Sequence, residues 1–310
     1  MPELAAGYAV RPATADDLDG IVELFDAYDV WDFGRTDTVR EHLEADWVAP
    51  GFDPSLDTWL VTNGDGKVVA FASVQGMATE AAREAYGRVH PDHHGRGIGS
   101  FLVPVTEDRA RARPGIAPAA VRNFSTSTDA SARTLLEDHG YRHVRMFWHM
   151  ERRLGHERGN PGPIEGITLR PMRAGEERDV HAVIDESFAE HWGDTTPPFD
   201  HWRVFMDQPW FDPGMAILAV EREEIVGAAI SLMASDAAWV RELGVRPPWR
   251  GRGIGSALLS SAFADLSRRG VTEVRLNVDA ENQTGATRLY ERAGMSVRRQ
   301  WLVYEKPLEG

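Results

Sequence analysis

The stretch "WRGRGIGSALL" (Trp249–Leu259) places three glycines and two arginines in a turn that leads directly into an apolar helical pattern. A close copy, "HHGRGIGSFLV" (His93–Val103), lies in the first half of the chain. Backbone N–H groups at a helix start have no partner inside the helix, and the helix dipole adds partial positive charge there. Glycines let an anion approach such a backbone closely, and arginine side chains suit phosphate oxygens. The sequence therefore predicts two phosphate-binding turns.

We expect the turn residues of both copies to contact phosphate. In the second copy these are Arg250, Gly251, Arg252, Gly253, Ile254, Gly255 and Ser256, and in the first they are His94, Gly95, Arg96, Gly97, Ile98, Gly99 and Ser100. Histidine, with a reference pKa of about 6.5, is mostly neutral at neutral pH. The second turn thus carries two permanent cations and the first carries one, which predicts tighter binding at the second. The alternative for each copy is a tight turn with solvated arginines.

The same order of signals repeats on both sides of these turns. Each half opens with a strand that ends in Arg-Pro and an acidic helix start, "YAVRPATADDLDGIVELF" from Tyr8 and "ITLRPMRAGEERDVHAVI" from Ile167. A strand pair, a strand ending in proline, the glycine turn, a helix, a strand and a further helix follow in both halves. The polar, Gly- and Pro-rich segment "RRLGHERGNPGPIEG" between them reads as a linker. We predict two domains, 1–154 and 167–310, joined by a linker at 155–166 and packed as a pseudo-dimer within one chain.

The composition restricts the class of protein. The 310 residues suffice for two domains, and 42% hydrophobic with 26% charged residues is typical of soluble globular proteins. The chain has no apolar run of membrane-spanning length, no signal-peptide pattern and no cysteine, so we expect a cytoplasmic protein without a membrane partner. The formal net charge of −14 argues against nucleic acid as a partner. The 11 histidines are scattered, so we expect no metal site.

Two other phosphate-binding motifs fit the turns less well. A P-loop is excluded because no Gly-Lys-Ser/Thr follows. Gly251, Gly253 and Ser256 imitate the Gly-x-Gly-x-x-Gly pattern of dinucleotide folds, with Glu273 about twenty residues further on. However, Glu273 begins a strand instead of ending one, and the preceding segments form a hairpin, which suits an antiparallel sheet. A dinucleotide-binding oxidoreductase therefore stays as a third-ranked alternative.

The segment "LGVRPPWRGRGIGSALL" resembles the acetyl-CoA signature of the GNAT superfamily of N-acetyltransferases, with its Gln/Arg-x-x-Gly-x-Gly/Ala core at Arg250, Gly253 and Gly255. The segment "NVDAENQTGATRLYERAGM" is similar to the next motif of that superfamily, including Asn282 and Tyr290. The resemblance covers the second half, and the first half matches more loosely. The two-domain length and the segment "DQPWFDP" further resemble mycothiol synthase and related tandem acetyltransferases of actinobacteria.

This resemblance implies an α/β fold of two tandem GNAT-like domains, each a mixed, mostly antiparallel central sheet flanked by helices. It implies acetyl-CoA as co-substrate and direct acetyl transfer to a small amine. In the superfamily, the strand before the turn separates from its neighbour, and its backbone binds the pantetheine arm. That role falls on Leu243, Gly244 and Val245, and on Val89 in the first half, while Asn282 completes the cofactor contacts.

The resemblance also implies the catalytic groups. Tyr290 occupies the usual position of the acid that protonates the leaving thiolate; the alternative is a tyrosine that only packs. An amine with a pKa near 10 must lose a proton, at a cost of about 4 kcal/mol at neutral pH. Glu242 is the candidate base, and its alternative is an ion pair with Arg241 or Arg275. The corresponding pattern of mycothiol synthase has a glutamate three residues before the position of Glu242, where this sequence has Trp239.

The acceptor pocket is expected around His191, Trp192 and Asp194, for which ordinary packing under a loop is the alternative. In the first half, Leu136 stands where Tyr290 stands in the second, and leucine cannot donate a proton. We therefore predict a catalytic C-terminal domain and a degenerate N-terminal domain. A rival from another class is a non-catalytic acyl-CoA sensor.

Overall fold

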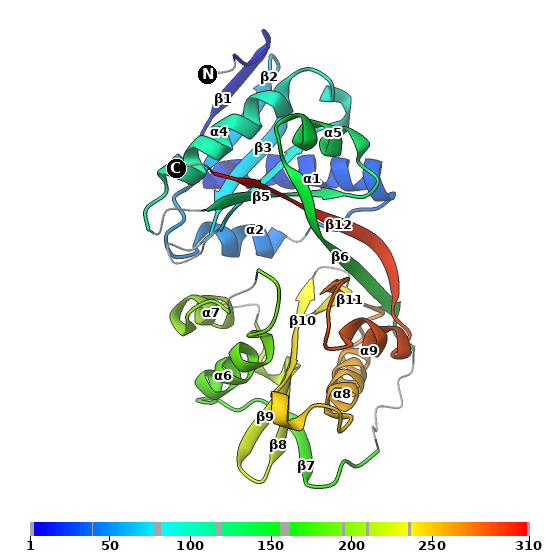
Figure 1. The fold of residues 1–310 in the computed structure, drawn as a ribbon. Helices are drawn as coiled ribbons and strands as arrows, with labels where there is room; N and C mark the ends of the chain where they lie inside the picture. The colour runs from blue at the N-terminus through cyan, green and yellow to red at the C-terminus, as the bar shows by residue number, and fades with distance from the viewer. Residues whose placement is uncertain are drawn as a thin grey trace. The chain divides into compact units, whose positions relative to one another are not determined.

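The structure is a computed structural model that describes residues 3–38, 40–76, 82–115, 119–155, 162–193, 196–208, 211–234 and 237–308. The chain forms two compact units (Figure 1). Unit 1 consists of Met1–Phe147 and Arg299–Gly310, and unit 2 consists of Trp148–Arg298. Two long strands, β6 (Arg142–Arg153) and β12 (Ser296–Pro307), each begin in one unit and end in the other. The end of β6 therefore belongs to unit 2 and the end of β12 to unit 1. The predicted linear domains, 1–154 and 167–310, instead keep each of these strands whole.

Unit 1 is built on a mixed sheet with the strand order β1-β2-β3-β4-β5-β12. Every strand pairs in the antiparallel direction except β4 and β5, which are parallel. Besides the two long strands, its elements are β1 (Tyr8–Arg11), η1 (Ala15–Asp17), α1 (Leu18–Phe33), α2 (Arg40–Trp47), α3 (Pro54–Asp57), β2 (Thr58–Asn63), β3 (Val68–Gln75), β4 (Ala82–Val89), η2 (Pro91–His93), α4 (Ile98–Ala112), β5 (Ala120–Thr126) and α5 (Ala130–Asp138).

Unit 2 repeats this plan with the strand order β6-β11-β10-β9-β8-β7. Here β10 and β11 are the parallel pair, and β7 to β10 are antiparallel. Its elements are β7 (Ile167–Pro171), α6 (Glu177–Phe188), α7 (Phe199–Met206), η3 (Pro213–Met215), β8 (Ala216–Glu221), β9 (Glu224–Ala234), β10 (Ala237–Val245), η4 (Pro247–Trp249), α8 (Ile254–Arg268), β11 (Glu273–Asp279) and α9 (Ala286–Arg292). The predicted α/β fold with two mixed, mostly antiparallel sheets is confirmed.

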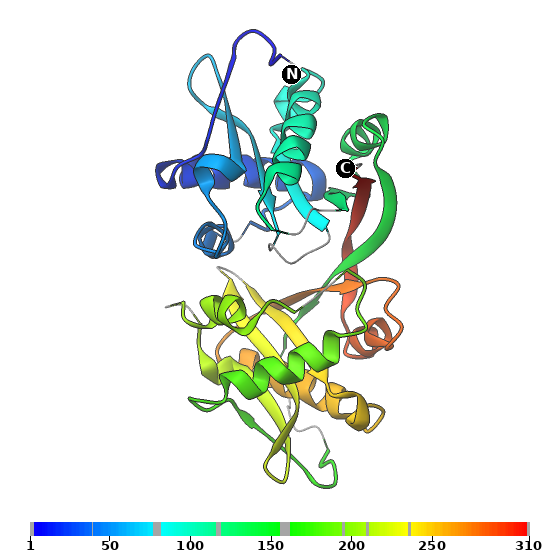
Figure 2. The ribbon, with the colours of Figure 1, turned by 60° about the vertical axis from the view of Figure 1, so that its left-hand side comes forward.

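Helices cover both faces of the sheet in unit 2 (Figure 2). Alternate residues of a strand point to opposite faces. Along β8, Leu218 and Val220 pack with α6 and α7, whereas Ile217 and Ala219 pack with α8. The two faces are therefore two separate apolar cores, and the loops between strands and helices are left to form the site.

The repeated Arg-Pro strand ends form the same contact in both units. Arg11 donates two hydrogen bonds to Asp17, at 2.6 Å and 2.7 Å, and Arg170 donates two to Glu176, at 2.6 Å and 2.8 Å. In each case the carboxylate also accepts a backbone N–H from the turn that precedes the first α-helix of the unit. Such bidentate pairs are the strong form of a charged hydrogen bond, so they fix the strand end against the helix start.

Candidate active site

The two parallel strands of unit 2 separate after a short contact. Strand β10 pairs with β11 at Ala238 and Trp239, and beyond that point its described pairing is with β9. A register shift between Val240 and Glu242 marks a bulge at the separation. Among the described residues, the edge of β10 that faces β11 therefore has no strand partner along the predicted cofactor residues Leu243, Gly244 and Val245. An open strand edge offers backbone groups to a ligand that carries amides.

The glycine turns have the same backbone in both units. Gly251 and Gly253 adopt left-handed φ values of 77° and 82°, and Gly95 and Gly97 adopt 70° and 80°. A Cβ atom on any of the four would meet nothing within 4 Å, so the backbone conformation, and not packing, calls for glycine. Gly253 and Gly97 are the N-caps of α8 and α4, and neither helix start has a side-chain cap. Both helix starts thus keep free N–H donors for an anion.

Both arginines of the second turn are engaged with the protein itself. Arg250 forms an ion pair with Glu190 at 3.0 Å and donates to the carbonyl oxygen of Ser187 at 3.1 Å. Arg252 forms an ion pair with Glu221 at 2.9 Å. No local sequence pattern connects Glu190 and Glu221 with the turn, so these two partners could not be predicted from the sequence.

Glu242 lies on β10 just after the bulge, with a side chain that is 14% exposed. Trp202 of α7 donates its indole N–H to this carboxylate at 3.1 Å, and the Arg241 guanidinium lies 3.4 Å away. Arg275, the other partner considered, instead contacts Glu273 at 2.7 Å. Glu242 is thus a nearly buried carboxylate whose orientation is set by an indole.

Tyr290 lies on α9 and is 7% exposed. Its ring belongs to a core cluster with Val240 and Val278, against which Leu243 of the open strand edge also packs. Burial raises the pKa of the Tyr290 phenol above its ordinary range, so the hydroxyl stays protonated at neutral pH. Within the part of the chain that the structure describes, this hydroxyl makes no hydrogen bond, which leaves its proton available to a ligand.

The structure brings two predicted site segments together. His191 follows α6, and its Nε2 atom lies 3.4 Å from the Nδ2 atom of Asn282, in the loop between β11 and α9. The Oδ1 atom of Asn282 accepts from the backbone N–H of Thr284 at 2.9 Å, which orients the amide. Trp192 is next to His191 in the chain, and the predicted site residue Asp194 lies outside the described residues.

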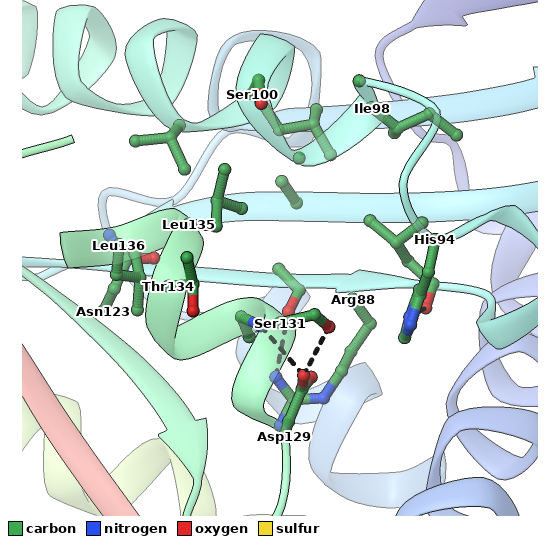
Figure 3. Close-up of a pocket in the computed structure, with 18 of the residues that line it drawn as sticks. Arg88, His94, Ile98, Ser100, Asn123, Asp129, Ser131, Thr134, Leu135 and Leu136 are labelled. Carbon is green, nitrogen blue, oxygen red and sulfur yellow. Dashed lines mark hydrogen bonds between the residues drawn. The ribbon is translucent and has the colours of Figure 1, made fainter. Parts of the chain in front are cut away.

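Unit 1 contains a cavity of about 330 Å³ at its own glycine turn. Strands β4 and β5 pair from Ala82 to Ala85 and then separate, as β10 and β11 do in unit 2. Figure 3 shows Ile98 and Ser100 of α4 on one side of this cavity and Leu135 of α5 facing them. The remaining predicted turn residues that line it are His94, Gly95, Gly97 and Gly99, together with Val89.

Comparison with known proteins identifies the family. The family model "Acetyltransferase (GNAT) family" matches residues 18–141 and 180–295, once in each half. The chain belongs to this family. The acetyltransferase is 31% identical over 255 residues to the mycothiol acetyltransferase of Salinispora arenicola, covering 76% of this chain and 77% of the relative. It is 32% identical over 252 residues to that of Beutenbergia cavernae, covering 76% and 79%.

Solved structures agree with the tandem arrangement. A GCN5-related N-acetyltransferase from Sphaerobacter thermophilus superposes on the acetyltransferase with a TM-score of 0.84 and 35% identity, covering 99% of this chain and 98% of that one. A tandem GNAT protein from the clavulanic acid biosynthesis pathway gives a TM-score of 0.78 at 15% identity, covering 98% and 99%, which supports the fold alone. The protein is an N-acetyltransferase with two GNAT domains in one chain, as the motifs predicted.

Three residues of this acetyltransferase distinguish unit 1 from unit 2. Alignment of the proline-ended strands at Val89 and Val245 places Tyr86 opposite Glu242 and Arg88 opposite Gly244. Arg88 is 5% exposed, and its guanidinium lies 4.6 Å from the ring centre of Tyr28 and 4.3 Å from that of Tyr86. Figure 3 places Arg88 and Asp129 toward the same end of the cavity. With Leu136 in place of Tyr290, unit 1 lacks both the candidate base and the candidate acid.

Two further absences concern the described residues alone. No helix among them is long and apolar enough to cross a bilayer. No group of three or more of their His, Asp and Glu side chains is placed to hold a metal ion.

Proposed function

We propose that the protein transfers an acetyl group from acetyl-CoA to the amine of a small molecule, and that the reaction takes place in unit 2. The observation that carries this proposal is the placement of Tyr290 in one core cluster with Leu243, on the strand that leads into the glycine turn. A candidate acid, an open strand edge and a helix start suited to an anion thus lie in one unit. In unit 1 the same position holds Leu136.

The residues of unit 2 fit acetyl-CoA. The backbone of Leu243, Gly244 and Val245 would bind the amides of the pantetheine arm, because this strand edge is open. The N–H groups from Gly251 to Ser256 would bind the pyrophosphate at the start of α8. Acetyl-CoA supplies a thioester that is activated toward attack by an amine.

Glu242 and Tyr290 would move the protons. Glu242, oriented by the Trp202 indole, accepts the amine proton directly or through one water. This offsets the cost of about 4 kcal/mol for deprotonating an amine with a pKa near 10 at neutral pH. Tyr290 donates its proton to the departing sulfur, and the raised pKa of the phenol keeps that proton in place until the step occurs.

The acceptor would enter beside His191, Trp192 and Asn282, where the segment after α6 meets the loop before α9. The acceptor can be identified by a direct screen of amines. The named relatives are mycothiol acetyltransferases, so an amino-sugar thiol belongs in the panel, together with aminoglycosides, polyamines and peptide N-termini. Trp239 occupies the position at which the mycothiol synthase pattern has glutamate, so we place no acceptor ahead of the others.

The test is the release of free CoA thiol from acetyl-CoA in the presence of each amine. We expect amine-dependent release by the wild-type chain and a strong loss in Tyr290→Phe. The mass of the amine acceptor should increase by that of one acetyl group, attached to nitrogen. Tight binding of acetyl-CoA without turnover on any amine would instead favour the acyl-CoA sensor, and binding of NAD in its place would favour the oxidoreductase.

A further inference from the structure

The two glycine turns differ in the charged side chains that contact their arginines. We propose that Glu190 and Glu221 hold Arg250 and Arg252 in ion pairs that the pyrophosphate of CoA must displace, so that unit 1 is the tighter CoA site. This inference rests on the proposed function, because it assumes that acetyl-CoA is the ligand of both turns.

Arg250 is held by three contacts in unit 2. Its Nη1 atom lies 3.0 Å from Glu190, its Nη2 donates to the carbonyl oxygen of Ser187 at 3.1 Å, and its Nε donates to the carbonyl oxygen of Val245 at 3.2 Å. The guanidinium therefore bridges the end of α6 and the end of β10. A phosphate that recruits this side chain has to compete with a carboxylate and two carbonyl groups.

Arg252 is also held by contacts within unit 2. Its Nη2 atom lies 2.9 Å from Glu221 and 3.3 Å from the carbonyl oxygen of Glu165. Glu221 also accepts the indole N–H of Trp249 at 2.9 Å, and this bond is the first of the causes that lower the pKa of the carboxyl. Glu221 thus stays ionised and oriented toward the turn at neutral pH.

Unit 1 has neutral residues at both equivalent positions. Trp31 stands where Glu190 stands, and its ring meets that of His94 edge to face at 5.0 Å. Asn63 stands where Glu221 stands, because Tyr8 pairs with Asn63 in the register in which Ile167 pairs with Glu221. Arg96 donates to the hydroxyl of Tyr8 at 3.3 Å and forms no ion pair within the described part of the chain.

The local charges follow from these contacts. In unit 2, two arginines and two carboxylates sum to zero beside the turn. At the four equivalent positions of unit 1, which are Trp31, Asn63, His94 and Arg96, only Arg96 carries a permanent charge, so these positions sum to plus one. The ion pairs are partly exposed, and the Glu190 side chain is 72% exposed. Each pair therefore contributes little to stability, and a ligand can displace it. The carboxylates therefore weaken binding in unit 2 without preventing it, which suits a site that must release CoA after each turnover.

The experiment is isothermal titration of CoA against the full chain, with the two turns separated by mutation. Gly97→Val disrupts the turn of unit 1 and leaves the turn of unit 2 intact. Gly253→Val disrupts the turn of unit 2 and leaves the turn of unit 1 intact. We expect the Kd of CoA to be about tenfold lower in Gly253→Val than in Gly97→Val. Adding Glu190→Gln and Glu221→Gln to Gly97→Val should lower its Kd by about tenfold. The reciprocal change, Asn63→Glu added to Gly253→Val, should raise the Kd several-fold.

A second measurement covers the case in which a valine variant does not fold. Hydrogen exchange of the otherwise wild-type chain, titrated with CoA, follows the amides at the starts of α4 and α8 separately. Protection at α4 should appear at lower CoA concentration than at α8, and the two Glu→Gln changes should move only the α8 midpoint. If both midpoints coincide and neither change moves them, the inference is wrong while the proposed function stands. If the wild-type chain binds no CoA, the proposed function itself fails.

Discussion

Trp202 donates its indole N–H to both carboxylate oxygens of Glu242, at 3.1 Å and 3.3 Å. The indole comes from α7 and the carboxylate from β10 just after the bulge, so two separate elements fix one side chain. An oriented, nearly buried carboxylate beside an open strand edge is what proton removal from an amine requires.

Glu242→Gln should lower kcat/KM by ~10²-fold at neutral pH, since the amide keeps the shape but cannot take a proton. The defect should shrink as the pH approaches the amine pKa near 10, because the acceptor then arrives deprotonated. The ratio of variant to wild-type rate, measured from pH 6 to pH 10, checks this. Trp202→Phe, which keeps an aromatic ring but loses the donor, should show a smaller defect. A ratio that does not change with pH would mean that Glu242 is not the base.

Tyr290→Phe should lower kcat by ~10²-fold and change the KM for acetyl-CoA little, because the ring still packs and only the proton donor is lost. Steady-state kinetics with a fixed amine and varied acetyl-CoA measures both constants. Tyr141→Phe removes a hydroxyl from another buried tyrosine, in the core of unit 1, and should leave kcat as in the wild type. Wild-type kcat in Tyr290→Phe, with chemistry rate-limiting, would show that this tyrosine only packs.

The two turns should differ in their effect on turnover. Gly253→Val places a β-branched residue at φ 82° and should abolish activity, because valine disfavours that conformation and obstructs the helix start. Gly97→Val makes the matched change at φ 80° in unit 1 and should leave most of the turnover intact. Activity assays on both variants, with circular dichroism to verify folding, decide the point. Activity that survives in Gly253→Val and disappears in folded Gly97→Val would reverse the assignment of the two units.

Acid should weaken the strand–helix contact of unit 1 over a defined range. The hydrogen bonds from Arg11 hold the pKa of Asp17 at about 2, below its usual value of about 3.9. A carboxyl with a lowered pKa in the folded state adds stability above the unfolded value and loses it as the pH falls through the folded value. The contribution of Asp17 should therefore be complete above about pH 5 and disappear between about pH 4 and pH 2.

Urea unfolding of wild type and Asp17→Asn, followed at pH 7 and pH 2.5, measures this contribution. The variant should have a lower midpoint at pH 7, and its midpoint should fall less on acidification. Asp16→Asn, a change at the neighbouring position of the same first turn, serves as the control and should behave as the wild type. Equal acid sensitivity of wild type and Asp17→Asn would contradict the role of the pair.

Local sequence predicted the parts of the site that depend on local backbone. The four left-handed glycines and the helix starts after them follow from turn chemistry and hydrophobic periodicity, whereas the mixed sheets were expected from the family resemblance. The partners of the arginines did not follow, because Glu190 lies sixty residues before Arg250 and meets it only through the packing of α6 on β10. Arg88 could not be predicted for a related reason: it stands out only when it is aligned with Gly244 in the other half.

The exchange of β6 and β12 has a consequence for the order in which the two units fold during synthesis. Unit 2 is one uninterrupted segment, whereas the sheet of unit 1 is extended by Trp301 to Pro307, which pair with Thr126 to Ala120 on β5. The ribosome delivers all of Trp148–Arg298 before that last strand emerges, and pairing across so long a sequence separation is slow. The half of the protein that is synthesised first is therefore the half that finishes folding last, and truncation after residue 298 would damage the N-terminal unit.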